Sequence, residues 1–99
     1  MRFLDFDYSE DPQGGGTFDT MASVRSDQVA AVRAEMAQVL DWAHAAFPGL
    51  QAPLEEGGEW DFDLQEQQDG TASPWHTLTL AVSGSPQFCA AFRQRFGMF

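Results

Sequence analysis

The sequence contains no lysine, no asparagine and no isoleucine. Its five basic residues are all arginine, against 15 Asp and Glu, so the formal net charge is −10. Without lysine the chain can use neither the lysine of a phosphate-binding loop nor a Schiff-base or general-base lysine. These absences exclude several large classes of enzyme mechanism.

Basic residues are also absent from the long stretch between Arg33 and Arg93, while nine acids fall within it. Affinity for the phosphate backbone comes mainly from basic side chains that displace counterions. We therefore expect no direct binding to nucleic acid. The same negative charge attracts a basic protein surface, which is the class of partner that the sequence favours.

Cysteine is nearly absent, since Cys89 stands alone and cannot form an internal disulfide. This is typical of the reducing cytoplasm, and we expect Cys89 to be a buried, inert thiol. No apolar run reaches the roughly 18 residues of a membrane-spanning helix. Residues 1–7 carry acids where a signal peptide needs an apolar core. We expect a cytoplasmic protein without membrane association. The scarcity of residues with A/T-rich codons indicates a GC-rich bacterial gene.

What is present is a globular composition, 43% hydrophobic and 13% aromatic. A chain of 99 residues forms one domain. Alternation of apolar and polar residues predicts four strands, over residues 3–8, 18–24, 59–66 and 75–82.

Helical spacing of apolar residues predicts two helices. The first runs over residues 26–46 with Ser26 as its N-cap, and the second begins after Ser85 with Pro86 in the first helical position. The second helix carries an aromatic stripe of Phe88, Phe92, Phe96 and Phe99. The order ββαββα predicts an α+β fold, a two-layer sandwich with a four-stranded, mainly antiparallel sheet and both helices packed on one face.

The predicted elements divide into similar halves, about residues 1–49 and 50–99. Leu4-Asp5-Phe6-Asp7 corresponds to Trp60-Asp61-Phe62-Asp63. One hypothesis is a duplicated ββα unit around a pseudo-twofold axis. The other is that both segments are ordinary amphipathic elements.

Strand parity places Asp5, Asp7, Asp61 and Asp63 on the face away from the helices. Aspartate is a poor strand residue, and like charges on neighbouring strands repel. One interpretation is a solvated face that opposes association. The other is an acidic surface that binds an arginine- or lysine-rich protein. Trp75 has the parity of this face, and beside the aspartates it would suit a cationic side chain.

Two other kinds of function stay open. A metal or small-molecule site, and perhaps a catalytic one, would lie near His76 if that imidazole paired with Asp61 or Asp63. Carboxylates on one strand face are about 6.6 Å apart, wider than a metal ion holds its ligands, so we assign no metal ligand. We also assign no cofactor and no catalytic residue. A homo-oligomeric module would use an exposed strand edge or face, and we expect a monomer or a weak homodimer.

Trp42 is predicted to lie on the outer side of its helix.

Overall fold

The computed structural model describes residues 3–12, 14–52, 56–68, 70 and 74–97. Its elements follow the predicted order ββαββα. They are β1 (Asp7–Glu10), β2 (Gly16–Arg25), a 3₁₀ turn (Ser26–Gln28), α1 (Val29–Ala46), β3 (Trp60–Gln68), β4 (Trp75–Gly84) and α2 (Pro86–Arg95). Phe99 of the predicted aromatic stripe lies outside the described residues.

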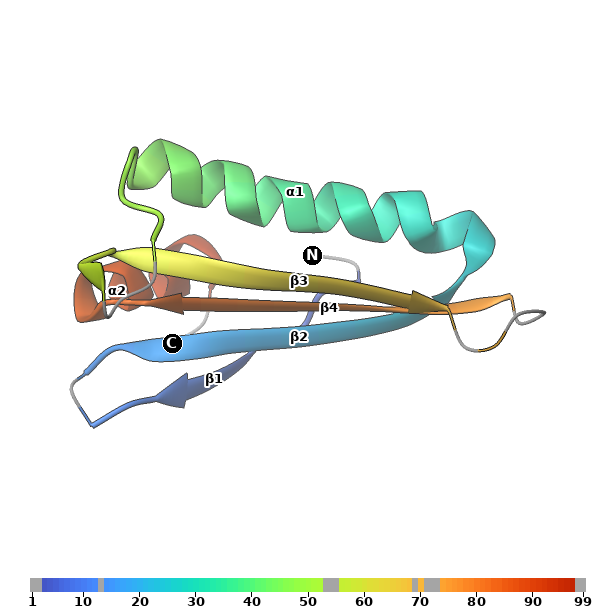
Figure 1. Ribbon diagram of the computed structural model, residues 1–99, viewed down its shortest axis with the longest axis horizontal. Coiled ribbons are helices and arrows are strands. Elements are labelled where there is room, and N and C mark those ends of the chain that lie inside the picture. The colour runs from blue at the N-terminus through green and yellow to red at the C-terminus, as the bar shows by residue number, and fades with distance from the viewer. Residues whose placement is uncertain (1–2, 13, 53–55, 69, 71–73, 98–99) are drawn as a thin grey trace.

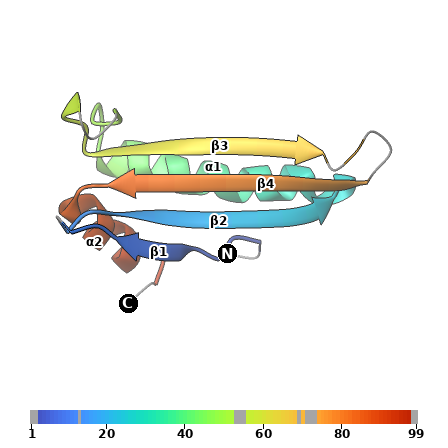
Figure 2. The same ribbon diagram turned by 60° about the horizontal axis from the view of Figure 1, so that its bottom comes forward.

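The four strands form one sheet in the order β1-β2-β4-β3, and each neighbouring pair is antiparallel. Both helices cover the same side of the sheet (Figure 1). Figure 2 shows α1 behind β3 and β4, and α2 behind β1 and β2. The predicted α+β sandwich is therefore confirmed, and one face of its sheet is left uncovered by helices. No helix in the described ranges is both long and apolar enough to span a bilayer.

The core lies between the sheet and the helices. Because side chains alternate along a strand, every second side chain of the two central strands points toward the helices and is removed from solvent. These inward residues are Phe18, Thr20, Ala22 and Val24 of β2 and Leu78, Leu80 and Val82 of β4. Trp60, Phe88 and Phe92 are also fully buried, so aromatic rings fill the end of the core beneath α2.

The first strand is shorter than predicted, since it begins at Asp7 and not at residue 3. The amides of Phe3 and Leu4 donate to the Glu35 carboxylate of α1, at 2.9 Å and 3.3 Å to Oε1. The Asp5 amide donates to the Thr20 hydroxyl at 3.2 Å. The chain before β1 bonds to these side chains and lies outside the strand ladder. Leu4 is nevertheless buried. The alternation of apolar residues therefore predicted the burial of Leu4 correctly, although the strand does not extend to this residue.

Of the two predicted N-caps, only Ser85 is confirmed. Its hydroxyl oxygen accepts a hydrogen bond from the Phe88 amide at 3.2 Å, and Pro86 opens the helix. Ser26 is not a cap, because α1 begins at Val29 without a side-chain cap. The Ser26 hydroxyl donates instead to the Pro74 carbonyl at 3.1 Å, which joins the two strand ends on that side.

Trp42 is half-buried, and the prediction that it lies on an outer side of the helix is wrong. Its ring centroid lies 5.8 Å from those of Phe88 and Phe92, and 5.4 Å from that of Phe96. The helical projection considered only the sheet as a burying surface. In the folded protein α2 packs beside α1 and covers a second flank of that helix.

Candidate functional site

The open face of the sheet is organised in rows of residues that lie opposite one another on adjacent strands. One row runs Asp7, Asp19, Ala81 and Asp63 from β1 to β3. The next row toward the β1–β2 turn runs Ser9, Thr17, Ser83 and Asp61. Three of the four positions in the first row are therefore aspartates. We call Asp7, Asp19, Asp61 and Asp63 the acidic patch.

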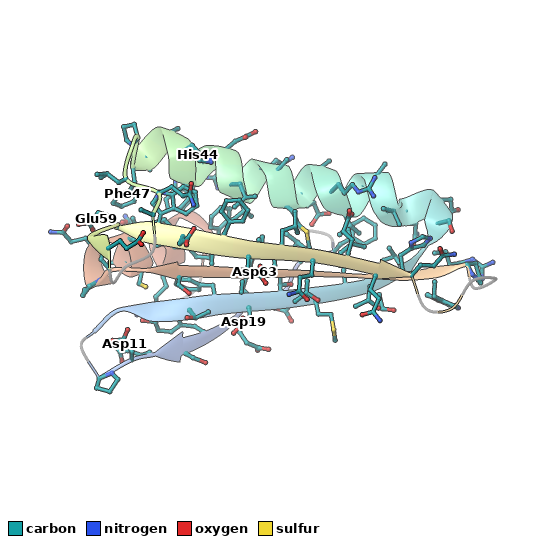
Figure 3. All side chains as sticks on the ribbon, viewed as in Figure 1. Asp11, Asp19, His44, Phe47, Glu59 and Asp63 are labelled. Carbon is teal, nitrogen blue, oxygen red and sulfur yellow. The ribbon has the colours of Figure 1, made fainter. Side chains whose placement is uncertain are left out.

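Asp19 is a member of the acidic patch that the sequence analysis missed. It lies directly opposite Asp7 and is exposed (Figure 3). Its parity was readable, since it is opposite to that of the core residues Phe18 and Ala22 and the same as that of Met21. The sequence search looked for repeated Asp-Phe-Asp patterns, and Asp19 belongs to none.

The four aspartates of the acidic patch differ in their burial and in their hydrogen bonds. Asp61 is half-buried and accepts hydrogen bonds from the Gln51 side chain and from the Phe62 amide, the latter at 2.9 Å. Asp63 accepts from the Gln65 side chain at 3.1 Å. Within the described part of the chain, no hydrogen bond or ion pair engages the carboxylates of Asp7 and Asp19.

The spacing of the acidic patch suits side chains better than a single ion. Asp19 and Asp63 lie two strands apart, about 10 Å between their backbones, with the small side chain of Ala81 between them. A divalent cation needs oxygens that converge at about 2.3–2.6 Å. Among the described residues, no group of three or more His, Cys, Asp or Glu is arranged to hold a metal ion. The patch therefore presents separate negative charges around an apolar floor.

Asp5 does not join this patch. It is exposed but precedes β1, outside the strand ladder, and its amide bonds to Thr20 on the helix-facing side of β2. The parity argument assumed that the strand began before Asp5. Since the chain leaves the sheet there, alternation no longer assigns Asp5 to a face of the sheet.

Trp75 is 44% exposed and has the parity of the open face, but it does not lie beside the aspartates. Ala81 is six positions further along β4, about 20 Å away along the strand. Its cross-strand neighbour is Arg25, whose guanidinium carbon lies 5.8 Å from the ring centroid. The chain thus places one of its own cations on Trp75, at the opposite end of the sheet from the acidic patch.

His76 is also separated from the aspartates. It pairs with Val24 and Gln68 and shares the helix-facing parity of Leu78, as the sequence predicts. Its Nε2 lies 3.0 Å from the Ser26 hydroxyl oxygen. Asp61 and Asp63 lie on the other face, opposite Ser83 and Ala81, so the structure does not form the His–Asp pair of the catalytic hypothesis.

Cys89 is buried, as expected, and its thiol lies 3.5 Å from the Gly84 carbonyl oxygen and 3.7 Å from that of Gly16. Burial raises the pKa of this thiol above its ordinary value of 9.0. Burial likewise raises the pKa of Tyr8. Ionisation would place a negative charge in an apolar site without water to solvate it. The thiol therefore stays protonated and unreactive near neutral pH.

These raised pKa values predict a loss of stability in alkali. Because the folded protein holds both protons more tightly than the unfolded chain, the unfolded chain loses its protons first as the pH rises. The stabilisation is complete below the ordinary thiol pKa and is lost as the pH rises above it. Urea unfolding should show a lower midpoint at about pH 10 than at about pH 7.5. Cys89→Ala should show a smaller decline, and an equal decline would contradict the role of the thiol.

Comparison of the chain with protein-family models, with curated proteins and with solved structures gave no match. The geometry and charge of the open sheet face are therefore the features that bear on function.

Proposed function

We propose that this protein is a non-enzymatic protein-binding module whose acidic patch docks an arginine- or lysine-rich surface of another protein. The observation that carries the proposal is the row of Asp7, Asp19 and Asp63 across one exposed sheet face. Asp7 and Asp19 are directly opposed like charges, an arrangement that destabilises a sheet. A basic partner would relieve that repulsion.

The arginines that the structure describes lie away from the acidic patch. Arg33 pairs with Glu66, a β3 residue of helix-facing parity. The guanidinium groups of Arg25, Arg93 and Arg95 lie over the rings of Trp75, Tyr8 and Phe96. Within the described residues, no ion pair joins an arginine to the acidic patch. Asp7, Asp19 and Asp63 are exposed, which supports their availability to a basic partner.

The patch has a natural position for one basic side chain. A guanidinium lying over Ala81 would be flanked by the carboxylates of Asp19 and Asp63, each about 5 Å to its side. The flat face of the guanidinium would contact the Ala81 methyl group. The N–H groups of the guanidinium would point outward to the two carboxylates. Asp7 and Asp61 would then attract further basic residues at the margin.

The test is binding of a synthetic arginine-rich peptide to two variants of equal net charge. The patch variant changes four acids to amides: Asp7→Asn, Asp19→Asn, Asp61→Asn and Asp63→Asn. The control variant changes four exposed acids outside the patch: Glu10→Gln, Asp27→Asn, Asp41→Asn and Glu56→Gln. Any difference between the two variants then reports the position of the charge and not its total.

The patch variant should bind the peptide about tenfold to a hundredfold more weakly than the native chain, since exposed charge pairs contribute about 0.2–1 kcal/mol each. The control variant should stay within about threefold of the native chain. Binding to the native chain should weaken as salt rises, because the contacts are screened. Equal losses in both variants would show that only net charge matters, and would overturn the proposed site. If the patch variant alone loses binding, affinity capture from native cells at low and high salt would identify the partner.

A further inference from the structure

A second surface, separate from the acidic patch, lies along the outer edge of β3. The sheet order places β1 and β3 at its two edges. β1 has only four residues, whereas β3 has nine. Short edge strands resist pairing, and long ones present a row of unused backbone donors and acceptors. The β3 edge is therefore the one to which another strand could add.

The backbone groups that point outward from β3 can be identified. The Trp60 carbonyl accepts from the Ala52 amide at 3.0 Å, so it points away from β4. The Phe62 amide donates to the Asp61 side chain and not to β4. Because outward and inward groups alternate along an antiparallel strand, the N–H and C=O groups of Leu64 and Glu66 also point outward.

Among the described residues, other chain segments cover only the start of this edge, and the Phe62 amide is engaged by the Asp61 side chain. Gln51 forms an isolated parallel bridge with Trp60. In the part of the chain that the structure describes, no other segment pairs with the outer edge of β3. In the middle of this edge stands Leu64, an apolar residue that is 42% exposed.

We propose that two copies of the chain associate through this edge, with β3 antiparallel to β3 of the second copy around a twofold axis at Leu64. The two four-stranded sheets would join into one, with all helices on the same side. This inference rests on the edge of the sheet, whereas the proposed docking function rests on its open face, although Asp61 and Asp63 of β3 take part in both.

The charges of β3 disfavour several positions for the twofold axis near the middle of the strand. An axis at Asp63 or at Glu66 would set that acid against its own copy. An axis at Phe62 would set Asp61 against Asp63. Like charges directly opposite each other destabilise a strand pair, so these three arrangements are unfavourable.

Two axes between these disfavoured positions, at Leu64 and at Gln65, differ in how they treat Leu64. An axis at Gln65 would set the exposed Leu64 against Glu66, an apolar group against a charged one. The axis at Leu64 sets leucine against leucine and Asp63 against the amide of Gln65. The resulting opposed pairs are Asp61–Gln67, Phe62–Glu66, Asp63–Gln65 and Leu64–Leu64. This register is self-complementary because every acid except Glu66 faces a glutamine.

Glu66 is already neutralised within its own chain. The Arg33 side chain binds it through Nε to Oε1 and through a second nitrogen to Oε2, the latter at 3.1 Å. The Arg33 guanidinium holds the pKa of the Glu66 carboxyl below its usual range, so the ion pair persists at neutral pH. Phe62 of the second copy would therefore meet an ion pair with no net charge, and its ring can pack against the Arg33 guanidinium.

The first test is sedimentation equilibrium at several protein concentrations and two salt concentrations. The native chain should show a reversible monomer–dimer equilibrium. Association should strengthen as salt rises, because each copy carries a charge of −10 and salt screens the repulsion. This is opposite to the salt response of the acidic patch, so failure of one proposal is distinguishable from failure of the other. A native chain that sediments as a monomer at every concentration would overturn the inference.

The matched variant is Leu64→Pro. Proline removes an N–H that points outward, so the hydrogen bonds to β4 are kept, and proline is tolerated at such edge positions. The dissociation constant of the dimer should rise at least about tenfold while the circular dichroism spectrum is unchanged. If Leu64→Pro does not fold, Leu64→Lys leaves the backbone intact and sets two cations opposite each other. Native-like association of the folded variant would contradict the proposed edge.

A disulfide tests the register itself, in a Cys89→Ala background. In the proposed register the two copies of residue 64 form a hydrogen-bonded pair, about 5.5 Å between Cα atoms, within the range of a disulfide. Leu64→Cys should therefore form a covalent dimer on mild oxidation. Gln67→Cys is the control, because it faces Asp61 and lies about 20 Å from its own copy. Cross-linking of Gln67→Cys at the same rate as Leu64→Cys would overturn the register.

Discussion

Replacement of Phe92 by alanine is expected to lower the free energy of unfolding by about 3–5 kcal/mol. Phe92 is fully buried where α2 meets the sheet. Its ring contacts Phe18 at 4.0 Å between centroids, Phe96 at 4.7 Å, Phe6 at 5.2 Å, Trp42 at 5.8 Å and Phe88 at 6.0 Å. The five neighbours come from the segment before β1, from β2, from α1 and from α2, so they cannot all move into the space left by the ring.

Thermal unfolding followed by circular dichroism should therefore show a Tm lower by on the order of 20 °C for Phe92→Ala. Phe96→Ala is the matched control, since Phe96 belongs to the same cluster but is only half-buried. Its loss should be about 1–2 kcal/mol, because water can enter the space that the ring leaves. Equal losses for the two variants would mean that burial does not decide the cost in this cluster.

Replacement of Gly84 by alanine should lower the free energy of unfolding by about 3 kcal/mol. A Cβ at this position would lie 2.2 Å from Cδ1 and 2.6 Å from Cγ of Phe88. The Phe88 ring cannot retreat, because it is fully buried and stacks on Trp60 with 5.7 Å between centroids. Glycine at the end of β4 is therefore required by the close approach of this ring to the backbone.

A double-mutant cycle separates this clash from a general intolerance of Gly84 to substitution. Phe88→Ala is itself destabilising, but it removes the Cγ and Cδ1 atoms that the new methyl group would meet at 2.6 Å and 2.2 Å. The double variant should be more stable than the sum of the single losses predicts, by at least about 1 kcal/mol in urea unfolding. Losses that add within about 0.5 kcal/mol would show that the Phe88 ring is not the cause.

Much of this fold was predictable because its signals are local. Alternation along 75–82 and helical spacing along 29–46 each depend on neighbours within a few residues, and both elements are present. The Ser85 cap belongs to the same class, since the hydroxyl and the Phe88 amide are three residues apart. Where the prediction failed, at Ser26 and in residues 3–6, side chains and amides bond to partners far along the chain.

The candidate site was only half predictable for the same reason. Parity placed Asp7, Asp61 and Asp63 on the open face, but it could not place Asp7 and Asp63 in one row. That row depends on the order β1-β2-β4-β3 and on the antiparallel register of three strand pairs. The register also brings Asp19 into the acidic patch and moves Trp75 to the far end of the sheet.

The absence of lysine and the charge of −10 are properties of the sequence by itself. So are the order of the elements and the face to which most side chains belong, because the periods of strands and helices are set by backbone geometry. Only the tertiary structure decided where the charge is concentrated and which strand edge stays open. Cross-strand neighbours are far apart in the chain, and the burial of the whole core selects their pairing, so no local pattern encodes them.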